Sequence, residues 1–168
     1  MESTALRELQ APLKERYREQ PEAAVITLRA GGDIGEGVTC SVQTGQELVR
    51  AGLHPATGGD GLSVCSGDML LQALVACAGV TLNAVATALE IPLRSGRVQA
   101  EGDLDFRGTL GVSRDAAVGF REIRLRFDID ADAPQEKLDK LVELTERCCV
   151  VYQTLRTAPP IEVTLRNA

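Results

Sequence analysis

The chain has 168 residues, a length that suits one domain with a buried core. Hydrophobic residues make up 44% and charged residues 25%, which is globular usage and excludes a largely disordered chain. A net charge of -6, no tryptophan and 3% aromatic residues argue against nucleic-acid binding, which needs positive surface and, for single strands, aromatic rings.

The cysteines and the apolar segments indicate a cytosolic protein. No segment offers roughly 18 consecutive apolar residues for a membrane span, and the polar start MESTALRELQ lacks a signal-peptide core. The five cysteines are Cys40, Cys65, Cys77, Cys148 and Cys149. Their odd number and irregular spacing disfavour a secreted disulfide framework, so we expect reduced thiols at rest.

Residues 4–20 are predicted to form an amphipathic helix. Leu6, Leu9, Leu13 and Tyr17 recur at helical spacing, and Pro21 ends the pattern. We therefore expect an N-terminal helical extension over residues 1–21, followed by a single domain over residues 22–168.

The next segments predict a hairpin and a loop. Residues 23–29 are rich in strand-forming side chains, Gly31 and Gly32 interrupt them, and residues 38–44 resume the pattern as a second strand. The Gly-rich stretch from His54 to Gly61 contains too many helix and strand breakers for regular structure.

Residues 66–90 carry the clearest helical pattern, with Ser66 as the expected N-cap and Asp68 in the first turn. One stripe of this helix consists of Leu70, Leu74, Cys77, Thr81 and Val85. Because apolar residues cover nearly the whole circumference, we expect the helix to lie inside the fold.

The remaining segments alternate between strand and helix patterns. Residues 97–110 and 118–130 predict antiparallel strands, residues 132–147 an amphipathic helix, residues 148–156 a short helix, and residues 159–166 a last strand. This order predicts an α+β domain with antiparallel sheets rather than a parallel βαβ design.

Taken from chemistry alone, the candidate residues support a bland interpretation. A free cysteine on an apolar helix, such as Cys77, is commonly buried filler, and the same holds for Cys40 and Cys65. Adjacent cysteines are a poor arrangement for zinc, and His54 is the only histidine, so we expect neither a metal site nor a Ser-His-Asp triad.

Two motifs read together change this interpretation. The segment SGDMLLQALVACAGVTL resembles the cysteine-bearing buried helix of the OsmC/Ohr family, with Cys77 at the position of the family's cysteine. The segment CVVYQTL resembles the second motif, Cys-Pro-Val with a leucine six positions after the cysteine, and is matched by Cys149 and Leu155 but not by Cys148. The resemblance spans roughly residues 25–165.

The resemblance implies a fold and an activity. The fold would be OsmC-like, with antiparallel sheets wrapped around buried central helices in an intertwined homodimer. The activity would be that of a thiol-dependent peroxidase, in which Cys77 attacks an organic hydroperoxide and Cys149 resolves the sulfenic acid into a disulfide. No bound cofactor is implied, because an external thiol or dithiol, such as a lipoylated protein, would restore the dithiol.

The resemblance also implies an activating pair of charged side chains. An arginine stabilises the thiolate in the family, and Arg29 is the candidate by location, although a solvent-facing strand arginine is an equal interpretation. The family's glutamate corresponds to Gly67 here, so Asp68 would have to orient the arginine or would simply complement the helix dipole. Val150 stands in place of the motif's proline.

A second hypothesis comes from a different functional class. The chain would keep the OsmC-like fold as a non-catalytic small-ligand or interaction protein, with Cys77 as an inert core thiol. Gly67 and the uncertain place of Arg29 favour this alternative.

Overall fold

The structure, a computed structural model, describes residues 3–34, 40–42, 51–62 and 64–165. Its helices are α1 (Ser3–Glu19), α2 (Ser66–Ala88), α3 (Phe106–Thr109), α4 (Gln135–Cys148) and α5 (Val150–Arg156), with the 3-10 turns η1 (Pro21–Ala24) and η2 (Pro55–Thr57). Its strands are β1 (Val25–Ile34), β2 (Cys40–Val42), β3 (Ala51–Gly52), β4 (Val64–Cys65), β5 (Leu93–Asp105) and β6 (Phe120–Ala131).

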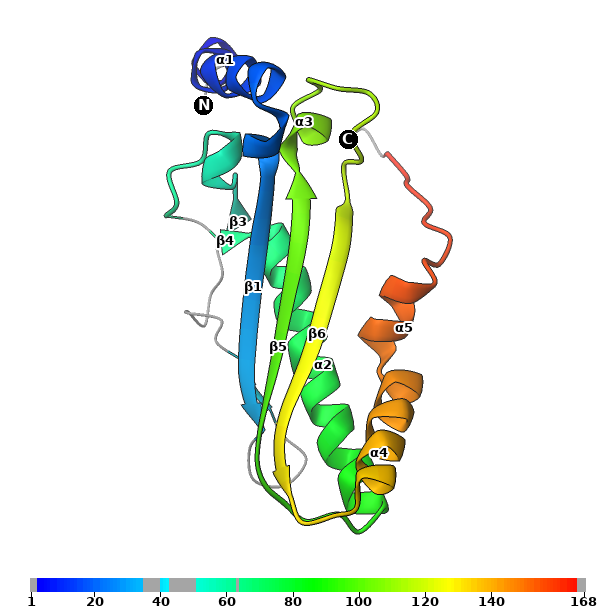
Figure 1. The fold of residues 1–168 in the computed structure, drawn as a ribbon. Helices are drawn as coiled ribbons and strands as arrows, with labels where there is room; N and C mark the ends of the chain where they lie inside the picture. The colour runs from blue at the N-terminus through cyan, green and yellow to red at the C-terminus, as the bar shows by residue number, and fades with distance from the viewer. Residues whose placement is uncertain (1–2, 35–39, 43–50, 63, 166–168) are drawn as a thin grey trace.

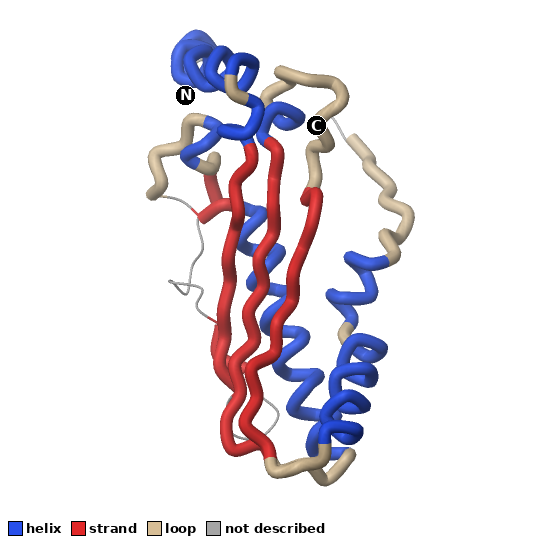
Figure 2. Tube along the Cα trace, viewed as in Figure 1, coloured by secondary structure: helices blue, strands red, loops and turns tan. Residues whose placement is uncertain are grey.

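The main layer is an antiparallel sheet of strand order β2-β1-β5-β6. Figure 1 shows the three long strands β1, β5 and β6 side by side, with α2 running along one face and α4 and α5 following one another beside β6. The tube in Figure 2 shows the same two layers, helices against strands. The short strands β3 and β4 form a separate parallel pair. The expected α+β architecture with an antiparallel sheet is confirmed.

The early hairpin is confirmed, but its first strand is longer than the glycines suggest. β1 runs through Gly31 and Gly32, which pair with Gln99 and Val98 of β5. The hydrogen bonds of a central strand position therefore outweigh the conformational freedom of these glycines.

The strand expected over residues 97–110 ends earlier, at Asp105. The Asp105 carboxylate accepts a hydrogen bond from the backbone N–H of Arg107 at 3.1 Å and thereby caps α3. An aspartate that satisfies a free helical N–H favours a helix start over continued pairing. Residues 106–109 consequently form a helical turn instead of strand.

The last predicted strand is wrong for the single chain, because residues 158–165 lie extended without a strand partner among the described residues. The alternating side chains Ile161, Val163 and Leu165 are 83%, 89% and 92% exposed. An extended segment of strand-forming residues gains little without a neighbouring strand to supply hydrogen bonds and packing.

α2 is the core helix. Its buried side chains include Leu71, Leu74, Val75 and Leu82, which pack toward the sheet and α4. Its N-cap is Cys65, which makes no side-chain capping hydrogen bond, so the expected cap at Ser66 is wrong by one residue. α2 is long and apolar enough to cross a membrane, but it packs on β1, β5, α4 and α5, as a core helix does.

α1 is attached to the domain through a few specific contacts. Tyr17 is only 2% exposed, and its hydroxyl donates to the backbone carbonyl of Ala56 at 2.6 Å. Gln10 donates its side-chain amide to the carbonyl of Thr57. The helix expected before Pro21 is confirmed, while the division of the chain into an extension and a domain at residue 21 stays a prediction.

A charged cluster ties the three long strands together on the face opposite α2. Asp103 of β5 accepts from Thr27 Oγ1 of β1 at 2.6 Å and from Arg124 of β6 at 2.7 and 3.1 Å. These hydrogen bonds from Arg124 and Thr27 lower the pKa of Asp103 to about 2. The carboxylate is thus held ionised by both neighbouring strands.

We expect Asp103→Asn to reduce the acid sensitivity of folding. A carboxylate with a lowered folded pKa contributes stability that is present above its unfolded pKa of about 3.9 and is lost as the pH falls toward the folded value. The variant should be less stable than the wild type near neutral pH, and the difference should shrink between pH 4 and pH 2. Urea unfolding across this range measures the effect; a pH-independent difference would contradict it.

Candidate functional site

The two sulfurs singled out in the sequence lie together where α5 begins beside the middle of α2. Cys77 is half-buried on α2, and Cys149, only 1% exposed, lies between α4 and α5. The Cys77 and Cys149 side chains share a hydrogen bond. Both are free thiols.

The turn at Cys149 explains how α5 reaches the sulfur of Cys77. Cys149 is extended (φ -73°, ψ 109°) and is both the C-cap of α4 and the N-cap of α5. Two hydrogen bonds hold α5 against the end of α4: Tyr152 Oη donates to Glu146 Oε2 at 3.1 Å, and Gln153 Nε2 donates to the carbonyl of Glu146 at 2.8 Å. The first backbone N–H groups of α5 therefore face α2.

The surroundings of Cys77 favour its thiolate. Burial raises the pKa of the Cys77 thiol, but hydrogen bonds from the Val151 N–H, the Cys149 thiol, the Thr81 hydroxyl and the Val150 N–H outweigh burial and lower the pKa overall. Hydrogen bonds to the charged form of an acid stabilise that form. Cys77 is thus more acidic than an ordinary thiol, although the main donors at its sulfur are neutral groups.

Cys149 has the opposite tendency. Burial, opposed by the Tyr152 N–H and reinforced by the neighbouring Cys77, raises the pKa of Cys149 to about 11. Between the two coupled sulfurs the proton therefore resides on Cys149 and the negative charge on Cys77. This is the division that a nucleophile and its waiting partner thiol require.

A pocket of about 510 Å³ opens next to the dithiol, between β6 and the helices α4 and α5. Leu74, one turn before Cys77 on α2, and Tyr152 and Leu155 of α5 belong to its wall. The rest of the lining is mostly apolar and comes from β6, with Arg121 and Arg156 also present. Such a lining suits a molecule with a hydrocarbon part.

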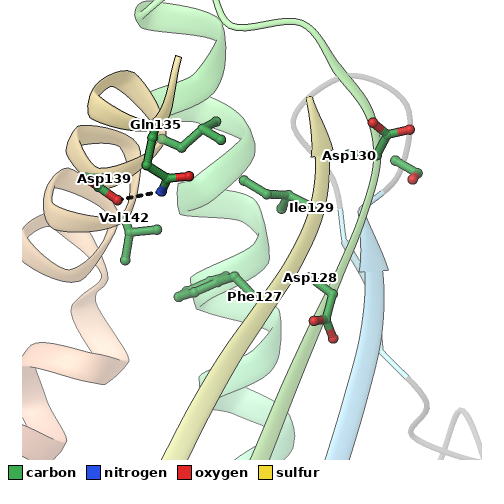
Figure 3. Close-up of a pocket in the computed structure, with 9 residues that line it drawn as sticks. Phe127, Asp128, Ile129, Asp130, Gln135, Asp139 and Val142 are labelled. Atoms are coloured by element: carbon green, nitrogen blue, oxygen red, sulfur yellow. Dashed lines mark hydrogen bonds between the residues drawn. The ribbon is translucent and has the colours of Figure 1, made fainter. Parts of the chain in front are cut away.

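A second pocket of about 590 Å³ lies farther along the same strand, between β6 and the start of α4. Figure 3 shows Phe127 and Ile129 pointing toward the helices, while Asp128 and Asp130 lie along the strand. Gln135 donates to Asp139 at 2.8 Å within α4. No cysteine lines this pocket, so it offers no thiol chemistry.

Arg29 is placed by its backbone alone, because its side chain lies outside the described residues. It pairs with Glu101 of β5, which in turn pairs with Arg124 of β6. This row alternates with the buried row that includes Ala100 and Gly102. The position of Arg29 therefore belongs to the sheet face that α2 does not cover, and the register does not bring it to Cys77 within one chain.

Asp68 is also separated from Cys77 within one chain. It precedes Cys77 by nine residues, which corresponds to about 13 Å along α2 and to roughly the opposite side of the helix. Burial raises the pKa of Asp68, and the nearby His54 opposes that shift. The charged neighbour given by the structure is thus His54, and the proposed role of Asp68 in orienting an arginine stays a prediction.

The other candidates have structural surroundings. His54 Nδ1 accepts from the backbone N–H of Ala56 at 3.0 Å, and its ring stacks on Phe106 at 5.1 Å. Cys148 is exposed, and Cys65 is half-buried at the start of α2. In the described part of the chain no three His, Cys, Asp or Glu side chains gather as metal ligands would.

Three of the groups at the Cys77 sulfur were missed in the sequence. Thr81 lies four residues after Cys77, and this spacing places both on one helix face. The stripe identified in the sequence contained Thr81, but a threonine on an apolar stripe carries no signal of its own. The N–H groups of Val150 and Val151 could not be found, because a backbone donor leaves no trace in side-chain identity.

Comparisons with known proteins agree with this architecture. Residues 58–164 match the family model of OsmC-like proteins. No curated protein matches the sequence. A crystal structure of an OsmC-like hydroperoxide resistance protein from Jannaschia sp. CCS1 is similar, with a TM-score of 0.59 and 17% identity over 86% of this chain and 95% of that chain.

An OsmC-like protein from Mycoplasma pneumoniae is similar as well, with a TM-score of 0.56 and 18% identity over 80% of this chain and 86% of that chain. At these identities the two structures establish the fold. The family match covers more than half of the chain, including both Cys77 and Cys149. The chain belongs to the OsmC-like protein family.

Proposed function

We propose that this protein is a thiol-dependent peroxidase that reduces organic hydroperoxides to alcohols. The observation that carries the proposal is the hydrogen-bonded pair of free thiols, in which Cys77 is more acidic than an ordinary cysteine and Cys149 is less so. Membership of a family that includes a hydroperoxide resistance protein supports the same reaction.

In the first step the Cys77 thiolate attacks the outer oxygen of the hydroperoxide. A sulfur–oxygen bond forms, the O–O bond breaks, and the alkoxide leaves with the electron pair of the broken bond. The Cys149 thiol, which holds the proton of the pair, is placed to protonate the alkoxide. The products are an alcohol, a sulfenic acid on Cys77 and a thiolate on Cys149.

In the second step the Cys149 thiolate attacks the sulfenic sulfur of Cys77. A disulfide forms, and hydroxide leaves and takes a proton from water. An external thiol or dithiol, such as a lipoylated protein, then reduces the disulfide and is itself oxidised. No bound cofactor is needed, because the electrons come from this reductant.

The substrate class follows from the pocket beside the dithiol. Its lining by Leu74, Phe120, Ile123, Leu125 and Leu155 favours a hydroperoxide that carries a hydrocarbon chain over hydrogen peroxide. A small polar peroxide would leave this apolar surface exposed to water. We therefore propose alkyl or fatty hydroperoxides as substrates.

We further propose that the working form is a homodimer. The segment that ends with Ile161, Val163 and Leu165 alternates apolar and polar side chains but has no strand beside it in one chain. β6 is the edge strand of the sheet, and an open edge is a template for pairing with another strand. A second copy would bury these apolar side chains and supply the missing hydrogen bonds.

Turnover of cumene hydroperoxide with dithiothreitol or a lipoylated protein tests the peroxidase. Cys77→Ser should abolish consumption, since it removes the attacking sulfur. Cys149→Ser should leave a sulfenic acid on Cys77 that dimedone traps and that mass spectrometry detects. Cys148→Ser is the matched control, because this neighbouring thiol is exposed, and it should behave as the wild type. Equal consumption by the wild type and Cys77→Ser would refute the proposed function.

Alkylation of the native protein distinguishes the peroxidase from a non-catalytic protein with an inert core thiol. Because its pKa is lowered, Cys77 should react with iodoacetamide at a lower pH than Cys149, whose pKa is about 11. Peptide mass spectrometry assigns the label to each cysteine. An unreactive Cys77 between pH 6 and pH 8 would support the inert-thiol alternative.

The dimer is tested by introducing charge on the apolar side of the C-terminal segment. Ile161→Asp combined with Val163→Asp should convert a two-chain particle into single chains, because both carboxylates would have to be buried in the interface. Thr164→Asp, on the alternate side of the same segment, is the control. Light scattering after size-exclusion chromatography gives the mass; a wild-type protein that is a single chain at micromolar concentration would contradict the dimer.

A further inference from the structure

The Cys77 sulfur is surrounded by donors from two different elements. Thr81 donates from α2 itself, and the N–H groups of Val150 and Val151 donate from the start of α5. The Cys149 thiol completes the set. These neutral groups stand where the family resemblance places a guanidinium and a carboxylate.

The Val150 N–H is free for this contact because of where the residue lies in the chain. It is the first residue of α5, and the first N–H groups of a helix have no partner within the helix. The extended backbone of Cys149 turns this N–H toward α2. A proline at position 150 would have no N–H to donate, whereas the valine of this chain has one.

Thr81 uses its hydroxyl differently from two other helical threonines of this chain. Thr87 Oγ1 donates to the carbonyl of Asn83 at 2.9 Å, and Thr145 Oγ1 donates to the carbonyl of Leu141 at 2.7 Å. This bond to the carbonyl four residues earlier is a usual choice for a threonine inside a helix. The Thr81 hydroxyl instead donates to the side chain four residues earlier, which is the thiol of Cys77.

The titratable groups near the sulfur come from the junction of α4 and α5. Cys149 contacts Cys77 directly. Behind it, Tyr152 is hydrogen-bonded to Glu146 and to Arg156. This arrangement pairs the nearest charged side chains with one another, so the donors to the sulfur itself are the amides, the hydroxyl and the partner thiol.

We propose that the Val150 N–H and the Thr81 hydroxyl are catalytic donors that hold the Cys77 thiolate ready for attack, in place of a charged side chain. The proposal deepens the peroxidase function and rests on Cys77 as its nucleophile. During the attack, negative charge leaves the sulfur for the alkoxide. Both donors then remain beside the oxidised sulfur.

The Thr81 donor is tested with Thr81→Val, which keeps the shape of the side chain and removes the hydroxyl. Loss of one hydrogen bond to a charged group should reduce the thiolate fraction about tenfold at pH values below the midpoint. The greater nucleophilicity of a more basic thiolate offsets part of this loss, so Cys77 alkylation should slow by roughly three- to fivefold. The midpoint of the alkylation rate against pH should move to higher pH.

Two further threonine variants control this experiment. Thr81→Ser restores a hydroxyl and should return the midpoint toward that of the wild type. Thr87→Val removes a hydroxyl that serves only the carbonyl of Asn83, and it should leave the midpoint unchanged. An unchanged midpoint in Thr81→Val, or an equal shift in Thr87→Val, would overturn the role of Thr81.

The Val150 donor is tested first with Val150→Pro. Proline is accepted at the first position of a helix, and the extended Cys149 is compatible with a following proline, so α5 should still form. The alkylation midpoint should again move to higher pH. Because the proline ring also adds carbon atoms near the sulfur, a second variant must remove the hydrogen alone.

The second variant replaces the Val150 amide by an ester. A synthetic peptide that begins with Cys149 and carries α-hydroxyvaline at position 150 is ligated to residues 1–148, and the same ligation with valine gives the matched control. The ester chain should show the alkaline shift of the midpoint and the ligated amide chain should not. Equal midpoints in the two ligated chains would overturn the role of the Val150 N–H.

The outcome for the donors is separable from the outcome for the peroxidase. Alkylation reports the acidity of Cys77 without any peroxide, whereas hydroperoxide consumption reports turnover. Shifted midpoints in a protein that consumes no hydroperoxide would support the donors and refute the peroxidase. Unshifted midpoints in an active peroxidase would refute the donors alone.

Discussion

The contact between the middle of α2 and the first turn of α5 is the interaction on which the proposed chemistry depends. A thiolate within an apolar core is unfavourable, because burial removes the water that stabilises its charge. The backbone amides of Val150 and Val151, together with the Thr81 hydroxyl, replace that water at the sulfur of Cys77. If α5 began one residue later or pointed elsewhere, these amides would not face α2.

The rest of the fold holds this contact in place. The antiparallel sheet presents an apolar face to α2, and the cluster around Asp103 joins β1, β5 and β6 on the opposite face. α4 packs on α2, and the bonds from Tyr152 and Gln153 to Glu146 set the angle at which α5 leaves α4. The thiol pair is therefore positioned by rigid elements and not by a loop.

A single chain leaves apolar surface uncovered. Met69, Leu70 and Val80 of α2 are 37%, 38% and 37% exposed, and Val150 beside the thiol pair is 70% exposed. A helix that is apolar around its circumference gains most stability when all sides are covered. These exposures on α2 and α5, with those of the C-terminal segment, agree with the proposed second copy.

Much of the architecture followed from the sequence, because periodicity depends on local spacing. The helix carrying Cys77, the long strand that includes Ile123 and Leu125, and the helix before Cys148 were all predicted near their observed bounds. Pairing overrode local preference elsewhere: β1 continues through Gly31 and Gly32 because β5 lies beside them, and residues 158–165 stay unpaired because no strand does.

For the candidate site, the sequence by itself determined which two cysteines belong together, through the register of two motifs read jointly. Only the tertiary structure decided what surrounds them. It brought the Thr81 hydroxyl and the Val150 N–H to the Cys77 sulfur and placed the backbone of Arg29 on the other face of the sheet. The reason is physical: side-chain identity is written in the sequence, whereas the direction of a backbone N–H is set by how the helices pack.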